Sequence, residues 1–334
     1  MKVQFKVLSA CTVLALGAFA IPAAHAMTVS PVMFDMEIAP GAHAQSSIRI
    51  LNDTKEAATY SFSAQNFVAS GENGAQEYVR EATTTDLASW VHLWQTSVTV
   101  QPDATADVSF EINVPTNAEP GGHYAAIFST HGGSNAAGAS SVGLSEQVGV
   151  LLLVRVPGDV REQASVESFR MAGGTVLDHL PANFDLRLRN SGSVHFRPTG
   201  SIVVKNMLGN TVARFDANPN HSAVLPNSVR RIETDWEKAP MISDKGFWNQ
   251  TKNEWNNFAL GKYTATAEML YGSKNVALTA TPVTFWVWPW RLMMLAVVGI
   301  IVFMILIGGC NRMIWKSRSE KRDARSEKKK RRKT

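Results

Sequence analysis

Cysteine is scarce in this chain, which has only Cys11 and Cys310 among 334 residues. Two cysteines exclude a disulfide scaffold and any zinc or iron–sulfur module that needs several thiolates. The hydrophobic fraction of 45%, against 18% charged residues, excludes a wholly disordered chain. The length is sufficient for two ordinary domains, each with its own core.

Recognisable enzyme motifs are also lacking. The sequence contains no G-x-S-x-G elbow, no phosphate-binding loop ending in Gly-Lys-Ser/Thr and no H-E-x-x-H pair. Seven histidines follow the N-terminal segment, and none is two or four residues from another, which favours solvated or singly hydrogen-bonded rings over metal ligands. We therefore predict no enzymatic activity, no cofactor and no metal site. A wall-modifying enzyme would need a convergent pair of carboxylates, whose separation a sequence does not give.

The N-terminal segment has the features of a secretory signal peptide over residues 1–26. Two lysines precede the apolar run Val7–Ile21, and Ala24–Ala26 provides an A-x-A site, so we expect cleavage after Ala26. An alternative is lipidation of Cys11, because Leu8–Cys11 resembles a bacterial lipobox. Most of the apolar run follows Cys11 instead of preceding it, which favours the signal peptide.

The C-terminal segment predicts one membrane-spanning helix over residues 286–311, with an aromatic flank. Leu292–Cys310 is uncharged, and its 19 residues would span roughly 28 Å as a helix. Tryptophans crowd both flanks, as in an aromatic belt: Trp286, Trp288, Trp290 and Trp315. Residues 311–334 contain 12 basic and 3 acidic residues, so the positive-inside rule puts the tail, 312–334, in the cytoplasm. We expect a type I single-pass protein of the cell membrane with extracellular N-terminal domains.

The middle of the chain has the periodicity of β-strands. Apolar and polar residues alternate through Ala106–Val114 and Phe184–Arg189, and Val148–Val156 is an apolar run typical of a strand buried on both faces. Turn signals such as Pro40-Gly41, Asn52-Asp53 and Pro157-Gly158 punctuate these segments. Only Thr85–Leu93 suggests a short helix, with Trp90 and Leu93 facing inward.

Short strands at this spacing predict an all-β fold of two immunoglobulin-like β-sandwiches. We place the first sandwich at residues 27–157, the second at 158–285 and the boundary near Pro157–Asp159. The Gly/Ser-rich stretch His131–Gly143 lies between two strands and is interpreted as a hairpin loop. Trp90 and Trp94 are expected to pack in the first sandwich.

The most distinctive exterior segment is Trp236–Phe258, which mixes aromatic rings with amides. Aromatic faces and amide donors suit sugars, so one hypothesis is a glycan-contacting loop built from four candidate residues: Trp248, Asn253, Trp255 and Asn256. The alternative, which we favour, is an inserted loop whose aromatic side chains cover the edge of the sandwich, because large aromatics are usually mostly buried.

The tail ends in a basic run that could contact anionic lipid headgroups, namely Lys328, Lys329, Lys330, Arg331, Arg332 and Lys333. Basic residues can bind the phosphates of any nucleic acid regardless of its sequence. Nucleic acid is nevertheless an unlikely partner for a tail that is tethered to the membrane. The simplest interpretation is that these charges only determine topology.

Several motifs resemble a known family. Met33–Gly41 (MFDMEIAPG) and Ile48–Thr54 (IRILNDT) look like the opening of an extracellular sandwich, and Ile112–Pro115 (INVP) leads to Glu119–Phe128 (EPGGHYAAIF). This order of motifs is similar to the WxL-interacting protein family of bacterial surface proteins. The resemblance implies a peptidoglycan-binding β-sandwich, a second immunoglobulin-like domain, one C-terminal transmembrane helix and a basic tail. Gly261–Thr266 fits a strand of that second domain.

From these features we expect a membrane-anchored binding or scaffolding protein of the bacterial cell surface. It would contact peptidoglycan or a partner surface protein through its β-sandwich domains. The alternative is a periplasmic-type, chaperone-like assembly factor, because fimbrial chaperones also have two immunoglobulin-like domains and bind through strand edges. Those chaperones are soluble, so the membrane helix favours the first interpretation.

Overall fold

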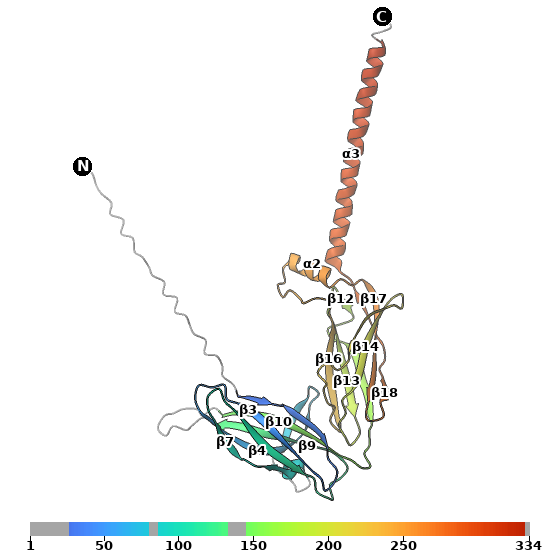
Figure 1. The fold of residues 1–334 in the computed structure, drawn as a ribbon. Helices are drawn as coiled ribbons and strands as arrows, with labels where there is room; N and C mark the ends of the chain where they lie inside the picture. Colours follow the sequence, from blue (N-terminus) through green and yellow to red (C-terminus); the bar gives the residue numbers. More distant parts are fainter. Residues whose placement is uncertain (1–26, 80–85, 133–144, 331–334) are drawn as a thin grey trace, which may run out of the picture.

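The protein is described by a computed structural model that covers residues 27–79, 86–132 and 145–330, with side chains described as far as residue 316. Two β-sandwiches follow one another along the chain, and one long helix, α3 (Trp290–Lys330), extends from the second (Figure 1). The fold class predicted from the sequence is confirmed. The expected signal peptide, residues 1–26, lies outside the described residues, as does most of the predicted hairpin loop His131–Gly143.

The first sandwich consists of two sheets and one helical turn. The smaller sheet has the strand order β1 (Thr28–Ser30), β3 (His43–Leu51), β8 (Thr105–Asn113) and β6 (Val91–Leu93). The larger sheet has the order β2 (Met33–Glu37), β10 (Ser145–Val156), β9 (Gly121–Gly132), β4 (Ala58–Ser70) and β5 (Ala75–Val79), and β7 (Ser97–Val100) also pairs with β4. The helical turn is α1 (Leu87–Trp90).

Alternation of apolar residues builds the core of this sandwich. Val108, Phe110 and Ile112 of β8 are fully buried, while the intervening polar residues face outward. The predicted short helix is a single turn because the chain becomes the strand β6 at Val91. Trp90 is buried as expected, but Trp94 is 58% exposed, so the prediction that Trp94 packs in the sandwich is wrong.

The second sandwich also consists of two sheets. One contains β11 (Ala164–Met171), β13 (Ala182–Asn190) and β16 (Ser228–Trp236), in that order. The other has the order β12 (Val176–Leu177), β19 (Val283–Val287), β17 (Gly261–Tyr271), β14 (Thr199–Asn206) and β15 (Thr211–Asp216), and β18 (Val276–Thr279) pairs with β17. The boundary predicted near Pro157–Asp159 lies between the end of β10 and the start of β11.

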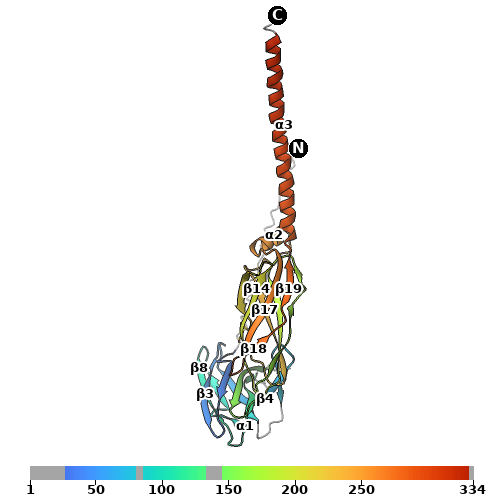
Figure 2. The same cartoon turned by 90° about the vertical axis from the view of Figure 1, so that its right-hand side faces the viewer.

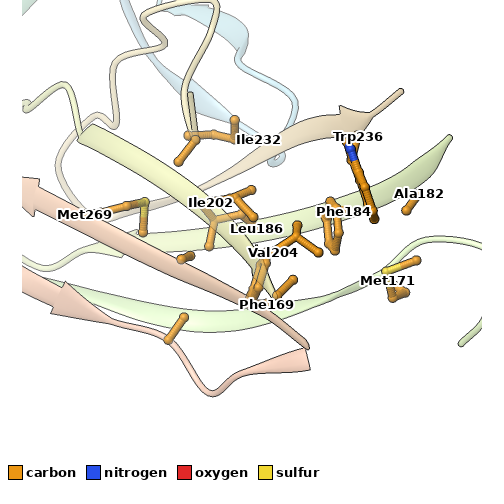
Figure 3. Close-up of a cluster of buried hydrophobic side chains, with 14 of the residues drawn as sticks. Phe169, Met171, Ala182, Phe184, Leu186, Ile202, Val204, Ile232, Trp236 and Met269 are labelled. Carbon is orange, nitrogen blue, oxygen red and sulfur yellow. The ribbon is translucent and has the colours of Figure 1, made fainter. Parts of the chain in front are cut away.

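Aliphatic and aromatic side chains together fill the core between these two sheets (Figure 3). The ring of Phe184 on β13 lies 5.7 Å from that of Phe169 and 5.8 Å from that of Phe285. Trp236 closes one end of this core, with its ring 5.4 Å from Tyr263. These contacts join strands from both sheets, so the second sandwich has a core of its own.

The helix α3 begins three residues after β19 ends and continues without a break to Lys330. Its segment Trp290–Lys316 has a mean hydropathy of 2.8 in its most apolar window, and none of that window is buried against the rest of the protein. This one long apolar helix fits a single-pass membrane anchor. A second helix, α2 (Phe247–Asn256), lies crosswise beside the first turn of α3 at the end of the second sandwich (Figures 1 and 2).

Candidate functional site: the cleft between the two sandwiches

The two sandwiches face each other across apolar side chains. Alternate residues of β10, Val150, Leu152 and Val154, point into the core of the first sandwich. Leu151 and Leu153 point to the other face of the sheet. There Leu153 forms a separate buried cluster with Phe67, Ala126 and Phe128. Ala223 and Leu225 of the second sandwich pack against this cluster. The second face of this strand is therefore covered both by neighbouring strands of its own sheet and by the second sandwich, which bury Leu153 as predicted and leave Leu151 partly buried.

A polar group ties the sandwiches together on one side of this contact. His195 is only 3% exposed, and its ring lies 3.1 Å from the hydroxyl of Tyr124 and 3.0 Å from a carboxylate oxygen of Asp35. Arg197 also donates to the Asp35 carboxylate. The hydrogen bond from His195, with the charges of His195 and Arg197, lowers the pKa of Asp35 despite its partial burial. Burial strongly raises the pKa of Tyr124, which keeps this hydroxyl protonated.

A second tie lies in the turn between β4 and β5. The carboxylate of Glu72 accepts hydrogen bonds from the guanidinium of Arg187, with one Nε–Oε2 distance of 2.7 Å. The main-chain carbonyl of Glu72 accepts the N–H of Arg231 at 2.8 Å. The hydrogen bond from Arg187 lowers the pKa of Glu72. This turn of the first sandwich thus docks on β16, an edge strand of the second.

Two open cavities lie next to these ties. One, of about 320 Å³, has an apolar floor that includes Met33, Phe67, Leu151 and Leu225. The other, of about 590 Å³, runs along β16 from Arg230 to Asp235. Both are lined by the same three residues, namely Asn220, Ser222 and Arg230. We call the two cavities together the interdomain cleft.

Arg230 is the cation that both cavities share. Its Nη2 lies 3.3 Å from the hydroxyl of Ser222, and its buried Nε has no hydrogen-bond partner. Burial lowers the pKa of Arg230, and no carboxylate among the described residues offsets that effect. The guanidinium lies against Gly74, where a Cβ would be only 1.2 Å from Nη1. A partly desolvated cation without a counter-ion is costly, so this arrangement favours an incoming anion.

The larger cavity also contains polar groups that form no hydrogen bond with the described residues: one side-chain hydroxyl and main-chain groups of β16. The hydroxyl of Thr234 is buried and makes no hydrogen bond. Alternate residues of an antiparallel strand direct their main-chain N–H and C=O groups to the same side. The main-chain groups of Glu233 and Asp235 therefore point away from β13, on the same side as the N–H of Arg231. None of the described backbone hydrogen bonds uses the outward groups of Glu233 and Asp235. The cleft therefore combines an apolar floor, an unpaired cation and a free strand edge.

The residues proposed from the sequence as a glycan site lie elsewhere, on α2 beside α3. Trp248 and Trp255 are 67% and 73% exposed, so our preferred alternative, that they cover the sandwich edge, is wrong for them. Asn253 is fully buried, and its amide both donates to and accepts from the main chain of Ile242, so a glycan contact there is also wrong. A glycan contact at Trp248, Trp255 and Asn256 stays a prediction. The side chains of Lys328–Lys330 and all of Arg331–Lys333 lie outside the described residues.

Sequence reasoning did not identify Arg230 or the buried His195. The sequence did contain a signal for Arg230. It shares its side of β16 with Ile232, Thr234 and Trp236, which are all buried, so the alternation puts an arginine at a position expected to be apolar. His195 has two side-chain partners and is buried, so the general interpretation of the histidines as solvated or singly bonded is wrong here. In the part of the chain that the structure describes, no three His, Cys, Asp or Glu side chains gather as metal ligands would.

Comparison with known proteins gives likeness in structure only. No family model and no curated protein sequence matches the chain. Among solved structures, the class 5 fimbriae chaperone CfaA shares 9% identity, covering 74% of this chain and 98% of its own, with a TM-score of 0.38. A chain of the CsuC–CsuE chaperone–tip adhesion subunit complex of Acinetobacter baumannii shares 11% identity, covering 77% and 99%, with a TM-score of 0.35. Identities at this level identify no shared function.

Proposed function

We propose that the chain is a membrane-anchored binding protein of the bacterial cell surface whose interdomain cleft takes an extended segment of a partner protein. The observation that carries this proposal is the half-buried guanidinium of Arg230 at the junction of the two cavities, whose buried Nε has no hydrogen-bond partner and which forms no ion pair with the described residues. We further propose that α3 crosses the cell membrane, with both sandwiches outside and the basic tail in the cytoplasm, as the positive-inside rule predicts.

The chemistry of the cleft suits an extended polypeptide that carries a carboxylate. A carboxylate beside Arg230 would form a charge-assisted hydrogen bond and supply the missing counter-ion. A strand added beside β16 would satisfy the outward main-chain groups at Glu233 and Asp235. Its apolar side chains could enter the floor formed by Met33, Phe67 and Leu151.

This chemistry favours a protein ligand over peptidoglycan for the cleft. Sugar sites rely on exposed aromatic faces with hydroxyl-binding groups. The cleft is instead lined by two arginines, Arg230 and Arg231, by a strand edge and by apolar side chains, and its two aromatic rings, Phe67 and Phe184, are buried. The proposal therefore corresponds to the chaperone-like assembly factor that the sequence left as an alternative, with a membrane anchor added. Peptidoglycan binding and membership of the WxL-interacting family stay predictions, and sedimentation of the protein with purified cell wall tests the former.

Paired peptides test the proposal directly. The full chain in detergent is titrated with fluorescent 12-residue peptides that alternate Val and Thr and carry one central Asp or, in the matched peptide, Asn. We expect the Asp peptide to bind more tightly, and Arg230→Gln to remove that preference. The control is Arg214→Gln, which changes an exposed arginine of the same sandwich outside the cleft.

Stability separates a functional from a structural role for Arg230. Because its charge is partly desolvated and unpaired, Arg230→Gln should leave the melting temperature unchanged or raise it. Equal binding of the two peptides to the unmodified protein, or a preference for Asp that survives Arg230→Gln, would refute the proposed site.

A further inference from the structure

The helix α2 has an inverted distribution of polar and apolar side chains. Its buried residues are Thr251, Asn253 and Glu254, whereas Trp248 and Trp255 are exposed. Seven residues make nearly two turns, so the two tryptophans lie on one stripe of the helix. Lys252 is exposed between them. A helix at a protein–water boundary normally buries its apolar side.

Polar contacts explain why this orientation is fixed. Asn253 exchanges two hydrogen bonds with the main chain of Ile242, at 2.9 and 3.0 Å. The side-chain oxygen of Asn257, just after the helix, accepts the main-chain N–H groups of Lys238 and Ala239. These bonds attach the polar side of α2 to the loop that precedes it, and therefore hold the tryptophan stripe away from that loop.

The same helix is attached to the start of α3. The buried carboxylate of Glu254 accepts the N–H of Leu292 at 2.9 Å and the guanidinium of Arg291 at 2.8 Å. Arg291 also binds Asp178 of the second sandwich at 2.8 Å. Because the membrane-spanning segment begins at Trp290, these bonds fix α2 at the level where α3 would enter the bilayer.

Other exposed apolar side chains gather at this end of the molecule. They lie at the first residue of α2, just after α2, and on the segment that ends at the first residue of α3: Phe247, Phe258, Leu260, Trp286, Trp288 and Trp290. Scattered apolar side chains are normal on a protein surface, but a group of this size beside a membrane span marks an interface.

We infer that α2 lies in the interfacial layer of the same bilayer that α3 spans, with Trp248 and Trp255 among the lipid headgroups. Tryptophan favours that layer because its ring is apolar and its N–H is polar. Lys252, between them, is placed for lipid phosphates, as in other interfacial helices. This inference rests on the proposed anchoring by α3, and it makes the second sandwich a support held against the membrane instead of a module on a free tether.

Spin labels measure this position in the full chain. In a Cys310→Ser background, Lys252→Cys and Asn256→Cys each carry a nitroxide on the exposed side of α2 and leave both tryptophans in place. The protein is reconstituted in vesicles of phosphatidylcholine and phosphatidylglycerol. Val302→Cys, in the middle of the span, and Trp94→Cys, in the first sandwich, are the lipid and water references.

Collision with dissolved oxygen, which concentrates in lipid, is compared with collision with a water-soluble nickel chelate. We expect the labels at 252 and 256 to collide with the nickel chelate less often than the label at 94 does. The ratio of their oxygen to nickel collision rates should lie between the ratios measured at 94 and at 302. The pair Trp248→Ser and Trp255→Ser should restore nickel contact at 252. The melting temperature should not change, since both rings are exposed, and Trp94→Ser should have no effect.

Three results would overturn the inference. The labels at 252 and 256 could give the same collision rates as the label at 94 while the label at 302 indicates a lipid environment. This result would leave the anchor intact but put α2 in water. They could be shielded from both reagents, which would mean a protein or glycan covers α2. They could also keep their lipid contact in the double tryptophan variant, so that the rings do not hold α2 there. A water-exposed label at 302 would instead refute the anchoring itself.

Discussion

The buried carboxylate of Glu254 accepts the main-chain N–H of Leu292, 38 residues further along the chain, at 2.9 Å. A carboxylate at this place stabilises the N-terminus of α3, because the first N–H groups of a helix have no partners within the helix. The same carboxylate belongs to α2, so one side chain fixes the direction in which α3 leaves the second sandwich.

Glu254→Gln should therefore loosen this junction. The partly buried guanidinium of Arg291 would keep only Asp178 as its counter-ion, and we expect a loss of about 1–3 kcal/mol in the free energy of unfolding of the second sandwich. Chemical denaturation of the full chain in detergent measures this loss. The control is Glu233→Gln, which changes an exposed ion pair worth about 0–1 kcal/mol. Equal effects of the two substitutions would contradict the role of Glu254.

Gly74 and Gly71 offer a matched test of the cleft. Both have positive φ angles, of 81° and 59°, so alanine at either position should cost about 1 kcal/mol of stability through backbone strain. Only at position 74 would the new methyl group collide with Arg230, since nothing lies within 4 Å of a Cβ at position 71. Gly74→Ala should therefore abolish the preference for the Asp peptide, and Gly71→Ala should keep it. Loss of the preference in both variants would point to general strain.

The contact between the sandwiches should weaken in acid. The pKa of Asp35 is lower in the folded protein than its ordinary value of 3.8, so its bonds to His195 and Arg197 stabilise the fold above that value. This stability is lost as pH falls through the lowered pKa. Asp35→Asn should be less stable than the unmodified protein at pH 7, and the difference should shrink towards pH 2. Urea denaturation across this range measures it, and a difference independent of pH would contradict the assignment.

The mature chain should begin at Met27. The side chain of Met27 is buried in the core of the first sandwich, its sulfur accepts the hydroxyl of Ser129, and its N–H lies 3.2 Å from the carboxylate of Glu146. Cleavage after Ala26 would turn this N–H into an ammonium group paired with Glu146. Intact mass gives the first residue, and a chain that begins with a lipidated Cys11 would contradict the prediction. Glu146→Gln should then cost about 1 kcal/mol in denaturation experiments.

Local patterns in the sequence predicted much of the fold. The alternation through Val108, Phe110 and Ile112 identified β8, and the apolar run at Val148–Val156 identified β10. These predictions hold because period-two burial depends on neighbours along one strand. The exposure of Trp94 was missed, because the burial of an aromatic side chain depends on segments distant in the sequence, and the ring of Trp94 contacts the nearby His92 while it stays exposed.

The candidate site was not predictable in the same way. His195 meets Asp35 across 160 residues of sequence, and Glu72 meets Arg187 across 115. No local period records such a pairing, because it forms only when the two sandwiches dock. The orientation of α2, with its polar side buried and its tryptophans exposed, also depends on residues outside the helix that bind its polar side chains. The pattern of apolar residues within the helix does not predict these partners.

Photocrosslinking in the native membrane tests the central claim most directly. A benzoylphenylalanine replaces Asn220, which is exposed and lines both cavities, or Asn210, an exposed control in the turn between β14 and β15. We predict a discrete crosslink to a partner polypeptide from position 220 that disappears with Arg230→Gln, and none from position 210. Equal crosslinking from both positions, or a crosslink from position 220 that persists without Arg230, would contradict binding in the cleft.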